Sequence, residues 1–267
     1  MAYKILGVDN QDMGSIESPT PEALKQFYDA IKAGYAGKLK NEFFEVLNAD
    51  GAKSGTLKPR DLIHKDGDWH GAFHLHVYSQ SDSGNYILFQ KRRHDKDVCP
   101  DKIDTVAAGH YAIGETIEDG VREVEEEIGL RVRFQDLTSL GRRINYDPQY
   151  DKGIFNFEFQ DVAAYRCDQP LTDYRLQEEE LAGLIKVELK SFIDLMMGRK
   201  DELKDVEGLM FHGDQLQGEG VRITRDDIWP APFDNYYLKT ALIISNICEG
   251  RKVPAEPYKL DVTNFFV

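Results

Sequence analysis

Three glutamates at helical spacing are the side chains in this 267-residue chain best suited to chemistry. Glu123, Glu126 and Glu127 fall at i, i+3 and i+4, so a helix brings their carboxylates onto one face. Like charges at this spacing destabilise a helix by about 0.2–0.5 kcal/mol per pair. A divalent cation would remove this repulsion, because carboxylate oxygens are natural ligands of Mg²⁺ and Mn²⁺. The other interpretation, a solvated face of an acidic protein, stays open from these three residues alone.

A short helix over residues 116–130 is expected to position these carboxylates. Thr116, with Asp119 three residues later, predicts the N-cap, and Gly129 has the place of a left-handed C-terminal residue. One apolar stripe of this helix should face the core and consists of Ile117, Val121, Val124 and Ile128. Gly120 costs about 1 kcal/mol in a helix interior. Stability alone therefore does not explain this helix, which favours a role for its acidic face.

The same stretch resembles the signature of the Nudix hydrolase superfamily, G-x5-E-x7-R-E-U-x-E-E-x-G-U, where U is aliphatic. The chain matches it from Gly109 to Glu115 and again from Arg122 to Leu130. The gap between Glu115 and Arg122 holds six residues instead of the family's seven, which puts the position of Glu115 in question. The resemblance implies an α/β fold, a Nudix α/β/α sandwich with a mixed sheet. It also implies Mg²⁺ or Mn²⁺ as cofactor and hydrolysis of a diphosphate linkage in a nucleoside-diphosphate-type or related X–P–P–Y compound.

A longer frame, from Phe43 to about Phe192, looks like the isopentenyl-diphosphate-isomerase-like branch of the superfamily. It covers somewhat more than half of the chain. Its shared elements are Lys58-Pro59-Arg60, His64 to His70, Leu88 to Arg92, Lys96 to Pro100, and Ala108-Gly109-His110. The chain departs from the branch at Asp101, where glycine is common after the proline.

This branch introduces isomerase chemistry as a rival function. The isomerases use a metal held by histidines and glutamates, and a catalytic cysteine just before the Gly-His pair. Here position 108 is alanine, which cannot move protons, so the sequence favours hydrolysis. His64, His70 and His110 are equally consistent with a second metal site, a diphosphate contact or ordinary hydrogen bonding. His74 and His76 are expected to be hydrogen-bonded core or surface residues.

The resemblance also assigns roles to individual residues. The expected cation ligands are Glu123, Glu126, Glu127, the Gly109 carbonyl and His70. The expected catalytic groups are Glu126 and Glu127, with Arg122 orienting the glutamates and Glu115 as its partner. The general base is Glu126, Glu127 or one of the three acidic residues Glu178, Glu179 and Glu180, and the sequence does not choose among them. The candidate contacts to substrate phosphate are Arg92, Arg93, Lys91 and His110. For the three basic residues at the strand end, an ordinary surface position is an equally common alternative. A non-catalytic ligand sensor is the remaining alternative, which the intact set of glutamates disfavours.

Composition limits the partners. A formal charge of −14 argues against a nucleic-acid backbone or an anionic membrane and leaves a small diphosphate compound as the expected partner. Three widely spaced cysteines predict neither a disulfide framework nor a zinc site and fit a reducing cytoplasm. No apolar run reaches the length of a membrane span, and the first residues lack the layout of a signal peptide.

The chain divides by pattern into three parts. Residues 1–40 are expected to form a helical extension, 41–198 the catalytic domain, and 199–267 a loop and helical extension that suits a homodimer. The N-terminal helix should begin at Pro21, capped by Thr20 or Ser18. The expected strands are 42–47, 73–77, 86–90, 131–134 and 153–165. Residues 213–220 are predicted as a loop, a helix should follow Pro232 and end at Gly250, and the apolar tail 263–267 should dock on the protein.

Overall fold

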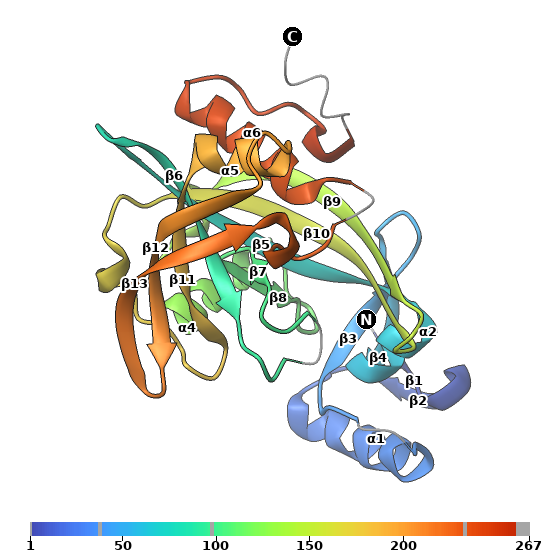
Figure 1. The fold of residues 1–267 in the computed structure, drawn as a ribbon. Coiled ribbons are helices and arrows are strands. Elements are labelled where there is room, and N and C mark those ends of the chain that lie inside the picture. The colour runs from blue at the N-terminus through green and yellow to red at the C-terminus, as the bar shows by residue number, and fades with distance from the viewer. Residues whose placement is uncertain (1, 37–38, 97–98, 232–233, 260–267) are drawn as a thin grey trace. The chain divides into compact units, whose positions relative to one another are not determined.

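The computed structural model describes residues 2–36, 39–96, 99–231 and 234–259 (Figure 1). Its strands are β1 (Tyr3–Leu6), β2 (Asp12–Ile16), β3 (Phe43–Leu47), β4 (Lys53–Pro59), β5 (Trp69–Ser81), β6 (Gly84–Arg92), β7 (Ile103–Asp104), β8 (Ala107–His110), β9 (Thr138–Gln149), β10 (Ile154–Arg166), β11 (Leu181–Glu188), β12 (Glu202–His212) and β13 (Gln215–Thr224). Its α-helices are α1 (Pro21–Gly34), α2 (Arg60–Asp66), α3 (Ile117–Gly120), α4 (Arg122–Ile128), α5 (Leu189–Met196) and α6 (Tyr236–Cys248). Short 3-10 turns cover Val8–Asn10, Phe134–Asp136, Leu171–Asp173, Arg225–Asp227 and Pro257–Lys259.

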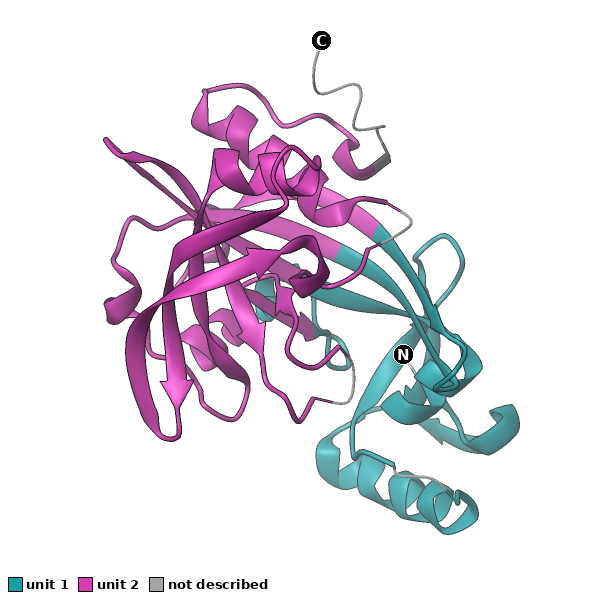
Figure 2. Ribbon diagram, in the orientation of Figure 1, with its two compact units in different colours: residues 1–73, 110–120, 144–160 teal, residues 74–109, 121–143, 161–267 magenta. Residues whose placement is uncertain are grey.

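The chain forms two compact units, coloured separately in Figure 2. Unit 1 comprises residues 1–73, 110–120 and 144–160, and unit 2 comprises residues 74–109, 121–143 and 161–267. Four of the five unit boundaries fall inside strands β5, β8, β9 and β10, and the fifth lies between α3 and α4.

Unit 1 is built on a mixed sheet. Its strand order is β5-β3-β4-β1-β2, in which β1 runs parallel to β4 and the other pairs are antiparallel. Helix α1 starts as predicted, because Thr20 Oγ1 accepts the backbone N–H of Ala23 at 3.3 Å and Pro21 takes the first position. Its residues Leu24 and Ile31 are buried in a core shared with β1, β4 and α2. The two strands ahead of α1 were not predicted, so this extension is more than a helix.

Unit 2 places helices against an antiparallel sheet of order β13-β12-β11-β6-β5. Helices α5 and α6 pack on one face of it, where the Phe89 and Phe192 rings lie 4.7 Å apart within the largest core cluster. Val124 and Ile128 of α4 are fully buried outside that cluster. The architecture is the mixed-sheet α/β/α sandwich that the sequence predicted.

Several local predictions are confirmed. Strands β3, β5, β6 and β10 cover the predicted strands at 42–47, 73–77, 86–90 and 153–165. Helix α6 covers the predicted helix before Gly250, which has a left-handed φ of 74°. Gly129 caps α4 with a φ of 67°, and Thr116 hydrogen-bonds the Asp119 carboxylate through both its N–H and its hydroxyl.

Other local predictions are wrong. The single helix over 116–130 is divided into α3 and α4 at Val121. Gly120, the last residue of α3, packs closely on Phe73, since an added Cβ would lie 2.8 Å from the Cβ of Phe73. Residues 131–134 form no strand, and 215–220 belong to β13 instead of a loop. The tail 263–267 lies outside the described residues, and no helix among those described is long and apolar enough to cross a membrane.

Candidate active site

Helix α4 presents the predicted glutamates at three different depths. Glu126 is exposed, Glu123 is partly buried, and Glu127 is only 8% exposed. The Glu123 carboxyl group lies against Gly109 on β8, since a Cβ added at Gly109 would be 2.6 Å from Glu123 Cδ. The absence of a side chain at Gly109 therefore allows the Glu123 carboxyl group and the backbone of β8 to approach closely.

Glu127 is the most unusual group of this set. Its Oε2 atom is buried without a hydrogen-bond partner among the described residues. Burial raises the pKa of Glu127 well above its usual range, and the negative charges of Glu123, Glu180 and Asp104 raise it further. A buried, unpartnered carboxylate oxygen among other carboxylates costs free energy in a metal-free protein. A divalent cation would supply the missing partner, so this donor set fits Mg²⁺ or Mn²⁺.

A methyl group at Gly109 is expected to disable this site. Gly109→Ala should push Glu123 out of place, because the new Cβ would overlap its carboxyl group, and should lower turnover by at least tenfold with little loss of secondary structure. Gly34→Ala is the matched control, since nothing lies within 4 Å of its added Cβ. Steady-state kinetics and circular dichroism of both variants test this expectation. Full activity in Gly109→Ala would contradict it.

Arg122 lies beside the glutamates that it is predicted to orient. Its Nη2 is 2.8 Å from Glu123 Oε1, and its Nε is 3.9 Å from Glu126 Oε1. Glu115 accepts the backbone N–H of Ala112 at 2.6 Å, which fixes the turn before α3. The pairing of Glu115 with Arg122 stays a prediction.

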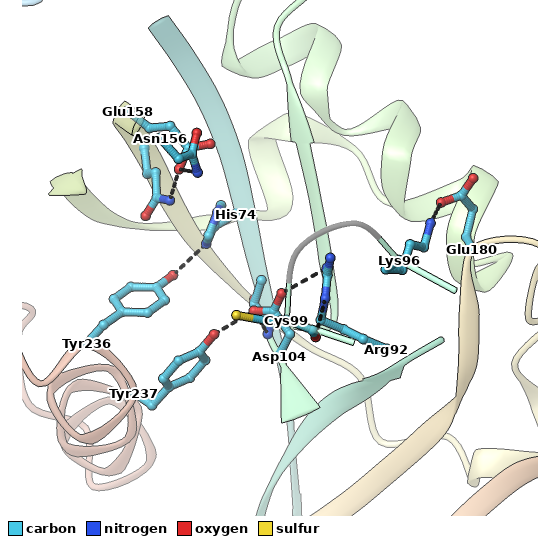
Figure 3. Close-up of polar contacts among 12 residues, drawn as sticks. His74, Arg92, Lys96, Cys99, Asp104, Asn156, Glu158, Glu180, Tyr236 and Tyr237 are labelled. Carbon is cyan, nitrogen blue, oxygen red and sulfur yellow. Dashed lines mark hydrogen bonds and ion pairs between the residues drawn. The ribbon is translucent and has the colours of Figure 1, made fainter. Parts of the chain in front are cut away.

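The acidic segment 178–180 is tied to the end of α4. The backbone N–H of Gln177 donates to the Glu127 carbonyl at 2.9 Å, just ahead of the three glutamates. Glu180 forms an ion pair of 2.6 Å with Lys96 (Figure 3). Both groups act electrostatically on Glu127. Among Glu178, Glu179 and Glu180, it is therefore Glu180 whose charge contributes most to the raised pKa of Glu127.

The two predicted phosphate-binding arginines already have protein partners. Arg92 reaches the Cys99 carbonyl at 3.2 Å and the Asp104 carboxylate at 3.4 Å, and its guanidinium lies 4.5 Å from the centre of the Trp229 ring. Asp104 also accepts the Tyr237 hydroxyl from α6 at 2.5 Å (Figure 3). Arg93 pairs with Asp95 at 2.9 Å. A phosphate contact by either arginine stays a prediction.

In unit 1, three of the predicted histidines come together. His64 on α2, His70 on β5 and His110 at the end of β8 have ring nitrogens that all lie within 4.8 Å of one another. The Nε2 atoms of His64 and His70 are buried without a hydrogen-bond partner among the described residues. Glu158 on β10 completes the group, with its Oε1 3.1 Å from His110 Nε2 and 3.9 Å from His70 Nε2.

Glu158 is a site residue that the sequence analysis missed. Its Oε2 accepts side-chain amides of Asn145, Asn156 and Gln160 at 2.8–3.0 Å, which leaves Oε1 directed at the histidines. The only sequence signal is one acidic residue between the aromatic residues of strand β10, at a position buried to 5% exposure. A carboxylate is costly at such a position, so it indicates a partner that pattern analysis does not identify.

Two of the three histidines, His64 and His70, are held in the neutral form that binds metals. Burial lowers the pKa of His64 to about 2, and the neighbouring His70 and His110 lower it further. Burial lowers the pKa of His70 to about 4, against the raising effect of Glu158. Neutral imidazole is the form that ligates metals, and three nitrogens with one carboxylate suit a divalent transition metal better than Mg²⁺.

His74 and His76 are hydrogen-bonded core residues, as predicted. The Tyr236 hydroxyl on α6 lies 3.0 Å from His74 Nδ1 (Figure 3). It also lies 2.9 Å from His76 Nε2. Burial lowers the pKa of His76 well below its usual value. These two residues therefore fix α6 to β5 within unit 2.

Comparison with known proteins finds relatives that are named Nudix hydrolases and relatives that are named isopentenyl-diphosphate isomerases. No family model matches the chain. An uncharacterised Nudix hydrolase of Clostridium acetobutylicum is 29% identical over 74% of this chain and 95% of its own length. An uncharacterised Nudix hydrolase of Listeria innocua is 32% identical over 55% of this chain and 75% of its own length. An isopentenyl-diphosphate Delta-isomerase of Aliivibrio fischeri is 28% identical over 54% of this chain and 78% of its own length. With these relatives and the glutamate-bearing helix in place, the chain belongs to the Nudix hydrolases and is a pyrophosphohydrolase acting on acid anhydrides.

Proposed function

We propose that the protein hydrolyses the diphosphate linkage of a small X–P–P–Y compound with Mg²⁺ or Mn²⁺ held by Glu123, Glu126, Glu127 and the Gly109 carbonyl. The observation that carries this proposal is the buried, unpartnered Oε2 of Glu127 among other carboxylates. Metal ligation explains why such a group is kept, whereas stability alone does not.

Each residue of α4 then has a role of its own. A bound cation supplies charge for the diphosphate oxygens and lowers the pKa of a water molecule. Arg122 holds the Glu123 carboxylate, at 2.8 Å, in the orientation that Gly109 permits. Glu126 is the proposed general base, because its carboxylate is exposed to the solvent that supplies the water and lies 3.9 Å from Arg122. Glu180, paired with Lys96, adds negative charge that acts on Glu127 and would favour a bound cation.

The histidine cluster is proposed to hold a further divalent cation. Its donors are His64, His70 and His110 with Glu158, which assigns the predicted metal ligand His70 to this group. The same assignment gives His110 a metal-binding role in place of a phosphate contact. Because His64 and His70 have lowered pKa values, protons do not compete for these nitrogens near neutral pH.

The isomerase alternative has less support. The chain carries Ala108 before Gly109-His110, so it lacks a group at that position that could move a proton. The relative named as an isomerase shares 28% identity, below that of the Listeria innocua hydrolase. Hydrolysis is therefore the proposed reaction, and isomerisation is an outcome that its test must be able to detect.

A substrate panel tests the proposal. The protein is incubated with Mg²⁺ or Mn²⁺ and nucleoside diphosphate sugars, dinucleoside polyphosphates, oxidised nucleotides and prenyl diphosphates, and products are identified by mass spectrometry and ³¹P NMR. Glu126→Gln is expected to lower turnover by about 100-fold or more, as loss of a general base does. Glu125→Gln is the matched control, because Glu125 lies on the same helix but pairs with Arg131 at 2.6 Å.

The products separate the alternatives. Phosphorylated fragments that disappear in Glu126→Gln and persist in Glu125→Gln support metal-dependent hydrolysis. A double-bond shift in isopentenyl diphosphate without cleavage would replace hydrolysis by isomerisation. Cation-dependent binding of a compound with no product would identify a sensor and overturn the proposal.

A further inference from the structure

Lys58, at the end of β4, is a charged side chain with no contact to solvent. It is 0% exposed, and its ammonium group makes three short polar contacts. These contacts are to Asp68 Oδ2 at 2.5 Å, Asp66 Oδ2 at 2.6 Å and Asn10 Oδ1 at 2.7 Å. An ammonium group has three N–H donors, so all of them are used. Burying such a group is costly, and well-packed apolar side chains often replace it without loss of stability.

Asp66 and Asp68, which bind the Lys58 ammonium, lie on either side of the turn between α2 and β5. Asp66 is the last residue of α2, which carries His64, and Asp68 immediately precedes β5, which carries His70. Gly67 between them has a left-handed φ of 72°, which permits the tight reversal. Lys58 therefore fixes the separation of the end of α2 from the start of β5.

The backbone carbonyl of Asp68 also determines which ring nitrogen of His70 carries the lone pair that can bind a metal. The Asp68 carbonyl oxygen lies 3.2 Å from His70 Nδ1. A carbonyl oxygen can only accept, so Nδ1 carries the proton and the lone pair is on Nε2. This Nε2 atom is buried, has no hydrogen-bond partner among the described residues and lies 3.9 Å from Glu158 Oε1. Backbone carbonyls that orient metal-binding histidines in this way strongly influence metal affinity.

The N-terminal extension contributes to the same arrangement. Strand β1 runs parallel to β4, with Ile5 beside Leu57, and the following turn brings Asn10 to Lys58. Asp9 and Asn10 both have left-handed backbones, with φ of 53° and 60°, which asparagine and aspartate adopt more readily than most residues. The extension is therefore built into the support of the histidine cluster.

We propose that Lys58, with Asn10, Asp66 and Asp68, forms a positioning network that presents His70 Nε2 and His64 to a divalent transition metal in the histidine cluster. This inference rests on the cation site proposed above for His64, His70, His110 and Glu158. It gives the N-terminal extension and the Lys58 ammonium a positioning role in metal binding, although neither would be a metal ligand.

Binding of Co²⁺ tests the network, because histidine-ligated Co²⁺ has visible absorption bands whose intensity depends on ligand geometry. Asp68→Asn keeps the carbonyl but removes the charge that holds Lys58. It is expected to weaken Co²⁺ binding about tenfold and to change the band intensities. Asp9→Asn is the matched control, because it removes the same charge in the same region from a side chain that is 86% exposed. It should leave affinity and spectrum unchanged.

A second variant covers the case in which an unpaired buried charge disturbs folding. Lys58→Met is made together with Asp66→Asn and Asp68→Asn, so that no charge is left buried alone, and its Co²⁺ affinity should fall at least as much as that of Asp68→Asn. Thermal unfolding of the metal-free proteins is measured in parallel. Altered stability with unchanged Co²⁺ affinity and spectrum in both variants would overturn the positioning role alone. A wild-type protein without histidine-ligated Co²⁺ would overturn the histidine site and the positioning role together, while leaving hydrolysis at α4 to its own test.

Discussion

Glu127→Gln is expected to make the metal-free protein more stable and to abolish most of its activity. The buried carboxyl group has a pKa well above its usual range, because burial and the charges of Glu123, Glu180 and Asp104 disfavour its ionised form. Because the unfolded chain ionises this group freely, its replacement by a neutral amide should raise the free energy of unfolding at pH 8. Loss of a cation ligand should lower turnover by about 100-fold or more.

The pH dependence of the free energy of unfolding shows whether the Glu127 carboxyl group causes the expected gain in stability of Glu127→Gln. A raised pKa in the folded state means that stability is lost as the pH rises above the ordinary carboxyl pKa near 4.5. The advantage of Glu127→Gln should therefore shrink between pH 8 and pH 5. Urea unfolding in EDTA measures it, with Glu125→Gln as control, and added Mg²⁺ should stabilise the wild type but not Glu127→Gln. A less stable Glu127→Gln protein that keeps its activity would contradict this explanation.

Acid is expected to destabilise the metal-free protein through its buried histidines. The pKa of His70 is lowered to about 4 and that of His64 to about 2, while both titrate near 6.5 when unfolded. The unfolded chain therefore binds more protons below pH 6.5, so stability is lost as the pH falls from 6.5 towards 4. At pH 5 the loss is about 2 kcal/mol for His70 alone, with a similar contribution from His64.

Urea unfolding between pH 8 and pH 5 in the presence of EDTA measures this loss. A His64→Asn, His70→Asn variant should show a shallower fall in stability over the same range. His212→Asn is the matched control, because this histidine is 49% exposed and belongs to strand β12 of unit 2, whereas the cluster belongs to unit 1. Equal pH slopes in the wild type and the double variant would show that the two histidines are not buried in neutral form.

The sequence predicted the parts of the site that are local. Glu123, Glu126 and Glu127 share one short helix, and Gly129 ends it, so spacing and capping are enough to place them. The strand pattern of 153–165 was also sufficient to predict β10. In each case, neighbours along the chain determine the conformation.

The parts that depend on distant contacts were not predicted. Glu158 became a site residue because β10 brings it to His110, 48 positions earlier in the sequence. The close packing of Gly120 on Phe73 joins residues 47 positions apart, and the division between α3 and α4 beside it was not predicted either. Asn10 reaches Lys58 through the parallel pairing of β1 with β4. Sequence periodicity contains no information about such pairings.

The cation site on α4 is tested most directly by anomalous diffraction from a crystal soaked in MnCl₂. We expect a manganese peak within about 2.0–2.3 Å of carboxylate oxygens of Glu123, Glu126 and Glu127 and near the Gly109 carbonyl oxygen. A map without that peak, at a Mn²⁺ concentration that supports turnover, and with the three carboxylates turned towards solvent, would contradict the proposed cation site.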